Sequence, residues 1–491
     1  MSVLKKNAFY NSAYQIIRLI FPLITYPYVS RILGPAGLGK VSYAQTLAEY
    51  FATFSLLGIP LYAVREISKS RTIPGKLDKN FSDLLALSLI LSIAALLIYS
   101  LLPYFFPKVA AEPALHWVFA FGIFFNWARI EWFYQGIENY RYITIRNLII
   151  RLASISLIFL VIHEKDHYIR YGAIWALSTL ATCFLNFFYS FRFVSFRFKN
   201  LELKKHFFNL LPSALLILSN TFYASIDTIM LGLMINDDKY SVGLYNVAGR
   251  LIRIALSLVV SINDVITPRL AFVLEEGNHL RFQEIIRKSL GMALYLALPA
   301  TIGIILISDD LIILFAGARF RPAILSMKIL ALQLVFMSIG RFFSQILYVG
   351  HKEKAILLIT FISLALSVSI NYLTIPLFRQ NGSAFSSTAT HILLMFMLFA
   401  ADRKTILEAI NIRPLVRIVL ANVPFALFLW FLKGQLAPLP IVLRLGLMVV
   451  SGVGVYVCVS RLTRLEPFSI LTSWILGRFR KKTPKPPELP S

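Results

Sequence analysis

The stretch LLALSLILSIAALLIYSLL at residues 84–102 contains no charged side chain. As a helix rising 1.5 Å per residue it extends roughly 28 Å, which is close to the ~30 Å hydrocarbon thickness of a bilayer. Similar apolar runs recur from one end of the chain to the other. The sequence therefore predicts an all-α polytopic membrane protein.

About fourteen runs are long enough to span a membrane. They lie at 11–32, 41–63, 82–106, 115–135, 143–163, 170–192, 208–235, 242–267, 285–308, 322–348, 355–376, 381–401, 417–434 and 441–461. The composition agrees, because 58% of the residues are hydrophobic, only 15% are charged and the mean hydropathy is +0.71. A soluble protein carries roughly 25% charged residues.

A weak internal repeat indicates how the spans are organised. GKVSYA at 39–44 matches GLYNVA at 243–248, and other pairs recur at a similar spacing. The repeat predicts two pseudo-symmetric six-helix bundles around a central cavity, as in many transporters, with two helices added at the end. The predicted divisions are an N-terminal bundle at 1–200, a C-terminal bundle at 201–410, two further spans at 411–465 and a basic, disordered cytoplasmic tail at 466–491.

The chain carries 49 Lys and Arg against 24 Asp and Glu, a formal charge of +25. If the N-terminus is cytoplasmic, the loops on the cytoplasmic side hold roughly three times as many Lys and Arg as the opposite loops. This bias explains the basic composition without nucleic acid as a partner. It predicts that both termini are cytoplasmic.

Ionisable residues inside the predicted spans are the main candidates for function. Each charge at the bilayer centre costs about 2.5–3.5 kcal/mol even on a lenient scale, so these residues must face one another or a wet interior. Cations are in excess, which predicts a water-filled cavity that binds an anion. The candidate substrate-binding residues are Arg18, Arg129, Arg250, Arg253 and Arg341, and the candidate coupling or gating residues are Glu49 and Asp227.

Simpler interpretations remain open for several charges. Arg151 and Lys328 lie near span ends, where long side chains reach the interface. Glu131 could pair with a neighbouring arginine. Glu49 aligns with Arg253 in the repeat, and the two could form either a structural salt bridge or a switch that opens on substrate binding. We predict neither a metal nor a cofactor, and we interpret GPAGLG at 34–39 as a tight turn between two helices.

Three stretches in the first 150 residues resemble a known family. They are RILGPAGLG at 31–39, GIP at 58–60, and EWFYQGIE at 131–138 followed by YITIRN at 142–147. They resemble the Wzx-type oligosaccharide flippases of the multidrug/oligosaccharidyl-lipid/polysaccharide exporter superfamily. The resemblance implies alternating access to a cationic cavity and an undecaprenyl-diphosphate-linked repeat unit as substrate, for O-antigen (lipopolysaccharide), capsule or exopolysaccharide synthesis.

The resemblance also implies a location and partners. We expect the bacterial inner membrane, contact with its lipids, and cooperation with a polysaccharide polymerase and a chain-length regulator. A multidrug antiporter would favour more acidic cavity residues, and a lipid II flippase is close in chemistry. A membrane polymerase or acyltransferase would need large outer loops with clustered catalytic residues, whereas the predicted outer loops are short. We therefore expect a transporter and not an enzyme.

Overall fold

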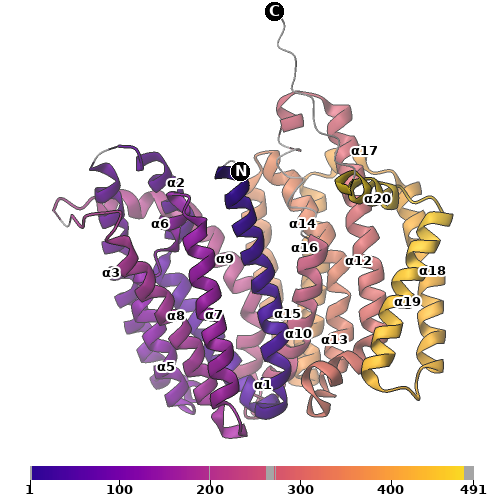
Figure 1. Ribbon diagram of the computed structural model, residues 1–491, viewed down its shortest axis with the longest axis horizontal. Coiled ribbons are helices and arrows are strands. Elements are labelled where there is room, and N and C mark those ends of the chain that lie inside the picture. The colour runs from indigo at the N-terminus through magenta and orange to yellow at the C-terminus, as the bar shows by residue number, and fades with distance from the viewer. Residues whose placement is uncertain (1–2, 74, 198, 261–269, 271, 480–491) are drawn as a thin grey trace, which may run out of the picture. The chain divides into compact units, whose positions relative to one another are not determined.

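The computed structural model describes residues 3–73, 75–197, 199–260, 270 and 272–479, and every regular element among these residues is a helix. Within the described part of the chain, twelve segments are long and apolar enough to cross a membrane. The predicted fold class, all-α and polytopic, is confirmed. Figure 1 gives the chain order of the helices.

The helix bounds are as follows, together with two of the 3₁₀ turns that separate helices; a third, η3 (Ala318–Phe320), lies between α12 and α13. They are α1 (Val3–Leu56), α2 (Ile59–Ser70), α3 (Lys76–Phe105), α4 (Pro107–Ala110), α5 (Pro113–Phe124), η1 (Phe125–Ala128), α6 (Glu131–Gly136), α7 (Tyr140–Val161), η2 (Lys165–His167), α8 (Tyr168–Ser190), α9 (Leu203–Met234), α10 (Tyr240–Val260), α12 (His279–Ala316), α13 (Ala323–Ala331), α14 (Gln333–Val349), α15 (Glu353–Phe378), α16 (Gln380–Ala401), α17 (Arg403–Ala409), α18 (Ile412–Gln435), α19 (Ile441–Leu462) and α20 (Glu466–Phe479).

Two differences explain why twelve segments qualify and not about fourteen. The predicted spans 11–32 and 41–63 both lie in α1, whose two halves meet at Gly34. Gly34 has φ 68°, a conformation that glycine adopts at little cost, so the break lies in the predicted 34–39 turn. The predicted span 115–135 is divided into α5, η1 and α6.

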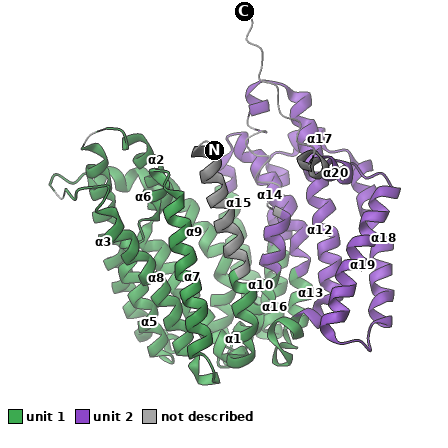
Figure 2. Cartoon of the chain, viewed as in Figure 1, with its two compact units in different colours: residues 1–251, 312–330, 357–390 green, residues 252–311, 331–356, 391–491 purple. Residues whose placement is uncertain are grey.

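The chain forms two compact units, drawn in different colours in Figure 2. Unit 1 contains residues 1–251, 312–330 and 357–390, and unit 2 contains residues 252–311, 331–356 and 391–491. The division into bundles at residue 200 stays a prediction. The predicted tail differs in its first part, because 466–479 forms α20, where Phe468 and Ile470 pack against the apolar core of unit 2. Residues 480–491 lie outside the described residues.

The core of unit 1 is built around α2, α3 and α6. Trp132, Phe133 and Tyr134 are 0–2% exposed and pack with Phe81, and Gly136 lies so close to Ile67 that a Cβ there would be 2.6 Å from its side chain. The motif EWFYQG is therefore mostly a packing motif. It anchors the residues at its start, where the chain passes a cavity.

The two glycines of the internal repeat contact each other's helices in unit 1. A Cβ at Gly39 would lie 1.9 Å from the Lys239 carbonyl oxygen, and a Cβ at Gly243 would lie 1.9 Å from the Pro35 carbonyl oxygen. The contact is reciprocal, because each glycine meets the residue four positions before the other glycine. Such an exchange of equivalent contacts is typical of two-fold symmetry, and it gives the repeat seen in the sequence a structural basis.

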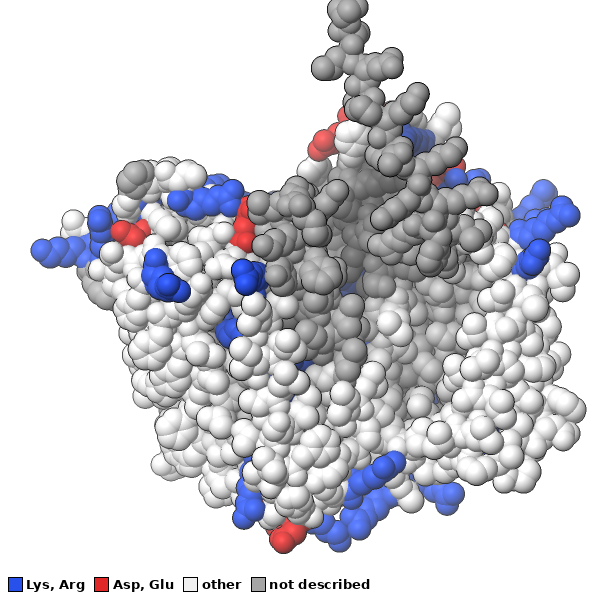
Figure 3. All heavy atoms as spheres, in the orientation of Figure 1, with Lys and Arg blue, Asp and Glu red and all other residues white. Residues whose placement is uncertain are grey.

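Ion pairs in unit 1 join loops that the alternating topology places on one side. Lys79 pairs with Glu202, and Arg71 Nη1 lies 2.8 Å from Glu138 Oε1. At the opposite helix ends, Lys40 Nζ lies 2.8 Å from Glu112 Oε1 and 2.9 Å from Asp238 Oδ1. On the face of unit 1 seen in Figure 3, Lys and Arg gather mainly at the two ends of the helices, and the band between them is mostly uncharged.

In unit 2, the last two spans are attached to α12 by polar contacts near one end, and α19 by a further contact along its length. Lys433 of α18 contacts Asp309 with its Nζ 2.6 Å from Oδ2, and Arg444 of α19 donates Nε to Asp310 Oδ2 at 2.7 Å. Further along, the Tyr456 hydroxyl donates to the Tyr295 carbonyl oxygen at 2.8 Å. These contacts hold α18 and α19 firmly against α12.

Candidate functional site

The chain is irregular between α5 and α6, within a predicted span. Arg129 (φ −73°, ψ 28°) and Ile130 (φ −54°, ψ 40°) depart from helical geometry. Asn126 fixes this break, because its buried amide donates to the Ala52 carbonyl oxygen at 2.8 Å and to Ser55 Oγ at 2.6 Å. Irregular backbone at membrane depth occurs where it lines a cavity, and broken helices build the binding sites of many transporters.

Two cavities of unit 1 meet at this break, and Arg129 and Glu131 line both of them. The smaller cavity has a volume of about 210 Å³ and the larger about 470 Å³. The smaller is lined by Phe21, Arg129, Glu131, Asn147, Ile150, Arg151, Ser154, Ile158, Ile174, Trp175, Ser178, Thr179 and Thr182. The larger is lined by Glu49, Ala52, Thr53, Leu56, Gly58, Pro60, Arg129, Glu131, Trp132, Gln135, Ile217 and Thr221.

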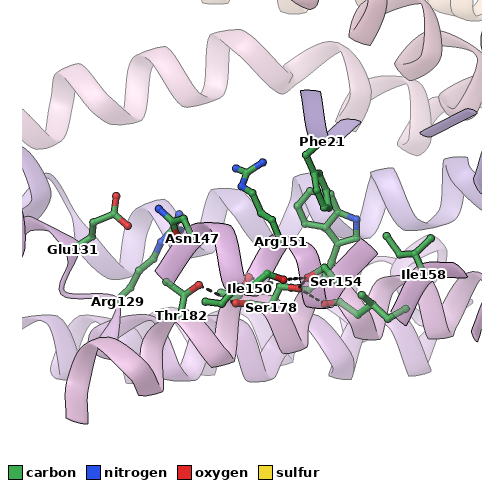
Figure 4. A pocket seen from close by; sticks show the side chains of 13 residues that line it. Phe21, Arg129, Glu131, Asn147, Ile150, Arg151, Ser154, Ile158, Ser178 and Thr182 are labelled. Carbon is green, nitrogen blue, oxygen red and sulfur yellow. Dashed lines mark hydrogen bonds between the residues drawn. The ribbon is translucent and has the colours of Figure 1, made fainter. Parts of the chain in front are cut away.

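Figure 4 shows how the side chains of the smaller cavity are distributed. Glu131, Arg129 and Asn147 lie toward one end, Phe21 and Ile158 lie toward the other, and Arg151 lies between them. The Arg151 guanidinium carbon is 5.3 Å from the centre of the Phe21 ring, a distance typical of a cation–π contact. The cavity is thus polar and charged at one end and more apolar at the other.

Glu131 is neutralised by an arginine that the sequence analysis did not select. Arg146 is 3% exposed and places Nη2 2.5 Å from Glu131 Oε2 and 2.9 Å from Asn147 Oδ1. It also donates to Asn186. The expected pairing of Glu131 with a neighbouring arginine is confirmed. Arg146 lies within the predicted span 143–163, after the EWFYQG motif. Its charge inside an apolar span was the feature of the sequence that could have identified it.

Arg129 differs from Arg146 in having no compensating partner. Among the described residues the Arg129 side chain forms no ion pair and no hydrogen bond, and it lines both cavities. A guanidinium presents five N–H donors in a planar fork that fits phosphate oxygens well. The geometry therefore leaves Arg129 able to bind an anion at the junction of the two cavities.

The other candidates of unit 1 lie in different settings. Glu49 lines the larger cavity with Arg129 and accepts a hydrogen bond from Gln45 Nε2 at 3.0 Å. Arg250 is half-buried, with its guanidinium carbon 4.3 Å from the centre of the Tyr26 ring. The structure thus brings Glu49 and Arg129 to one cavity, while Arg250 lines neither of the two cavities described above.

Asp227 is held in a polar contact among three helices. It is 5% exposed and accepts hydrogen bonds from the Tyr245 hydroxyl and from Asn371 Nδ2, each at 2.7 Å. Neutral donors that bind a buried carboxylate offset much of its desolvation cost. This arrangement connects α9, α10 and α15, and Asp227 lines neither of the two cavities described above.

Three candidates lie outside these groups. Arg18 belongs to α1, but its side chain lies outside the described residues. Arg253 of α10 and Arg341 of α14 are exposed and belong to unit 2. The alignment of Glu49 with Arg253 stays a prediction, as does a role for each of these residues in binding.

Neutral polar residues of the smaller cavity were missed from the sequence. Asn147, Trp175 and Ser178 line it, yet their residue types occur in many helices without a functional role. Asn147 ends the YITIRN stretch quoted above, whereas for Trp175 and Ser178 only their shared face of α8 could have drawn attention to them.

Two protein-family models and several known proteins match parts of this chain. The family model described as "Polysaccharide biosynthesis protein" matches residues 4–273, and the model described as "MatE" matches residues 212–373. The chain is 26% identical over 163 residues to the "Putative O-antigen transporter" of Escherichia coli (strain K12), covering 33% of this chain and 39% of that protein.

A second relative and a solved structure extend the comparison. The chain is 27% identical over 185 residues to the "Probable lipid II flippase MurJ" of Bdellovibrio bacteriovorus, covering 36% of this chain and 35% of that protein. Each match therefore spans less than half of the relative. A structure described as "Lipid II flippase MurJ, inward closed conformation" superposes with a TM-score of 0.74 at 15% identity, covering 96% of this chain and 100% of that chain. At this identity the likeness shows a shared fold.

Proposed function

The chain belongs to the polysaccharide biosynthesis protein family, whose model matches more than half of it, and from this premise we propose that it is a flippase. Its substrate is an undecaprenyl-diphosphate-linked oligosaccharide repeat unit, moved from the cytoplasmic to the outer leaflet of the bacterial inner membrane by alternating access. The unit then serves the synthesis of a surface polysaccharide. The E. coli relative named as an O-antigen transporter supports this substrate class.

The observation that carries the proposal is the uncompensated Arg129 at the junction of two cavities. An arginine that faced lipid at the bilayer centre would cost about 2.5–3.5 kcal/mol or more, so its accessible position suggests a ligand or water around it. A diphosphate is a suitable ligand, because it offers oxygens for bidentate hydrogen bonds and carries negative charge. Cavity space on either side of Arg129 leaves room for the sugars and for solvent.

The membrane potential favours the proposed direction of transport. One elementary charge crossing the membrane gains about 2.3 kcal/mol per 100 mV, so two negative charges moving outward gain about 4.6 kcal/mol when the inside is negative. The positive-inside distribution of Lys and Arg supports cytoplasmic termini. A polymerase and a chain-length regulator are the proposed partners on the outer side.

Substitution of Arg129 tests this function. In cells that depend on this protein for polysaccharide export, Arg129→Gln should reduce export at least about tenfold while the protein remains in the membrane, since a charged hydrogen bond is worth about 1.5–3 kcal/mol. Arg141→Gln is the matched control, because Arg141 is exposed at the start of α7 and lines neither cavity. Equal export by wild-type protein and Arg129→Gln would remove Arg129 from the substrate site.

A lipid II flippase is the second candidate function. The match to the Bdellovibrio relative and the fold shared with a solved lipid II flippase favour it. Both functions need a cationic contact for a diphosphate, so they differ in the sugars that the protein accepts. Growth of cells that lack their own lipid II flippase would support this candidate if it depended on expression of this chain.

A further inference from the structure

The smaller cavity of unit 1 lies on the protein-facing side of α7. Its lining includes positions 147, 151, 154 and 158, which share one helical face because they recur every three or four residues. The opposite face carries exposed apolar side chains, among them Ile149, Leu152 and Leu160 at 54–72% exposure. The exposed apolar face of α7 suits contact with lipid. The cavity lies on the other face of α7 and is therefore turned away from the lipid.

Asn147 presents an unused donor in this cavity. Its Oδ1 faces Arg146 Nη2 at 2.9 Å, and an arginine only donates, so the orientation of the amide is fixed. Its Nδ2 is buried and, among the described residues, has no hydrogen-bond partner. A buried donor without a partner is costly, whereas a ligand oxygen at this position would remove that cost.

The hydroxyl groups of the cavity are arranged as acceptors. Ser154 Oγ lies 2.7 Å from the Ile150 carbonyl oxygen, Ser178 Oγ lies 2.7 Å from the Ile174 carbonyl oxygen, and the two hydroxyl oxygens lie 2.6 Å apart. One hydroxyl therefore donates to the other, which donates to its own backbone carbonyl oxygen. Thr182 Oγ1 also donates to a backbone carbonyl. Because each hydroxyl proton is already used in a hydrogen bond within the protein, what these oxygens can still offer a ligand's O–H or N–H groups is lone pairs.

Trp175 adds an aromatic side chain to the same lining. An indole combines a large apolar face with one N–H donor, and among the described residues this N–H has no hydrogen-bond partner. The lining thus combines an aromatic face, unused donors and unused acceptors. That mixture matches a sugar ring, which has apolar C–H faces and a rim of hydroxyl groups.

We infer that the smaller cavity is a subsite for one sugar ring next to the diphosphate, with Asn147 and Trp175 as specificity-determining residues. The inference rests on the proposed function, since Arg129 at the edge of this cavity would hold the diphosphate. The volume of about 210 Å³ lies below the roughly 300–1,000 Å³ of pockets for drug-sized ligands, so it suits one ring and not a whole oligosaccharide. The remaining sugars extend beyond it.

Transport with defined sugars tests the inference. Proteoliposomes containing the full chain would be supplied with undecaprenyl diphosphate that carries one glucose, galactose, N-acetylglucosamine or N-acetylgalactosamine. The rate at which each lipid reaches the opposite leaflet would be measured with an impermeant sugar-modifying enzyme. We expect wild-type protein to move one of the four at least about tenfold faster than the slowest, because unpaired site groups discriminate strongly against the wrong hydroxyl pattern.

Two variants and a control identify the residues responsible. Asn147→Ala and Trp175→Leu should each reduce the preference to within about threefold, since the lost contact is the one that discriminates. Trp117→Leu should keep it, because Trp117 is 53% exposed on α5 and lines neither cavity.

Other outcomes would overturn the inference in distinguishable ways. Equal rates for all four sugars, or a preference that both variants keep, would overturn the sugar subsite and leave the flippase function intact. Failure of wild-type protein to move any of the four would overturn the proposed function, and the subsite with it.

Discussion

Arg146 connects the cavity residues to the protein core. It is buried and contacts Glu131, Asn147 and Asn186, so its removal leaves a carboxylate and two amides without their main partner. Breaking a buried pair on one side costs about 3–5 kcal/mol. Arg146→Met should therefore lower the free energy of unfolding by about this amount, with a clear fall in melting temperature in detergent.

The control for this prediction is Arg151→Met, at the next turn of α7. Arg151 is half-buried, lines the smaller cavity and contacts the Phe21 ring, so we expect a change in stability below about 1 kcal/mol. The double variant Arg146→Met, Glu131→Gln should recover part of the stability lost, because no lone charge remains. Equal melting temperatures for Arg146→Met and wild-type protein would show that the pair is not structural.

Lys239 should give the protein a pH-dependent stability. It lies between α9 and α10, donates to the Gly232 carbonyl oxygen at 2.6 Å and lies 4.1 Å from the centre of the Tyr43 ring. Burial, with a smaller effect from nearby Lys108, lowers the pKa of Lys239 from 10.5 to about 8. The unfolded chain thus binds this proton more strongly than the folded protein.

The sign of the effect follows from that difference. Between about pH 8 and pH 10.5 the unfolded state carries more protons, so this residue makes the free energy of unfolding rise as the pH is raised. Below pH 8 both states are protonated and the contribution stays constant. Thermal unfolding of Lys239→Met should lack this rise, whereas Lys165→Met, at an exposed position, should keep it. The same slope in all three proteins would contradict the assignment.

For individual residues, the sequence predicts the charged members of the site better than the neutral ones. Arg129 and Glu49 stand out because a charge within an apolar span needs a reason, and both line the larger cavity. Asn147 and Trp175 carry no such signal, since a neutral polar or aromatic residue fits many membrane helices. Their role depends on which helical face meets the cavity, and only the packing decides that.

Among the elements, the reciprocal contact of Gly39 and Gly243 brings two segments of the repeat into close backbone contact. A Cβ at either position would overlap a carbonyl oxygen at 1.9 Å. Gly39→Ala and Gly243→Ala should each force α1 and the start of α10 apart, at a cost of about 1–3 kcal/mol typical of overpacking. We expect lower melting temperatures and slower transport.

Gly122→Ala is the matched control, because a Cβ on that helical glycine of α5 would meet no atom within 4 Å. It should be neutral or slightly stabilising, as alanine favours helix more than glycine does. If Gly39→Ala and Gly243→Ala behaved like Gly122→Ala, the close contact would not be a feature of the folded protein.

Most helices could be predicted from the apolar runs, but the break between α5 and α6 could not. Residues 115–135 have the composition of an ordinary span, with Arg129 and Glu131 near one end. The interruption comes from tertiary contacts of Asn126 with α1, which no local pattern contains. The break at Gly34, by contrast, can be predicted from the sequence, because the glycine and the proline that follows it act on the local backbone.

For the whole molecule, the topology explains the distribution of charge. Ion pairs link loops on the same side of the membrane-spanning helices, and apolar side chains such as Leu97, Leu152 and Leu177 are exposed between the two ends in unit 1. This pattern agrees with a multi-pass membrane protein whose charged residues meet water or headgroups. The sequence predicts the alternation of sides from its Lys and Arg. It contains no pattern that fixes how the spans pack.

The most direct measurement compares cells with and without this protein, with active glycosyltransferases but with neither a polysaccharide polymerase nor another flippase. A membrane-impermeant reagent that modifies sugars would report how much of the lipid-linked repeat unit is exposed on the outer face. The account predicts modification that depends on the protein and is lost in Arg129→Gln. Equal modification in cells with and without the protein would contradict the flippase function.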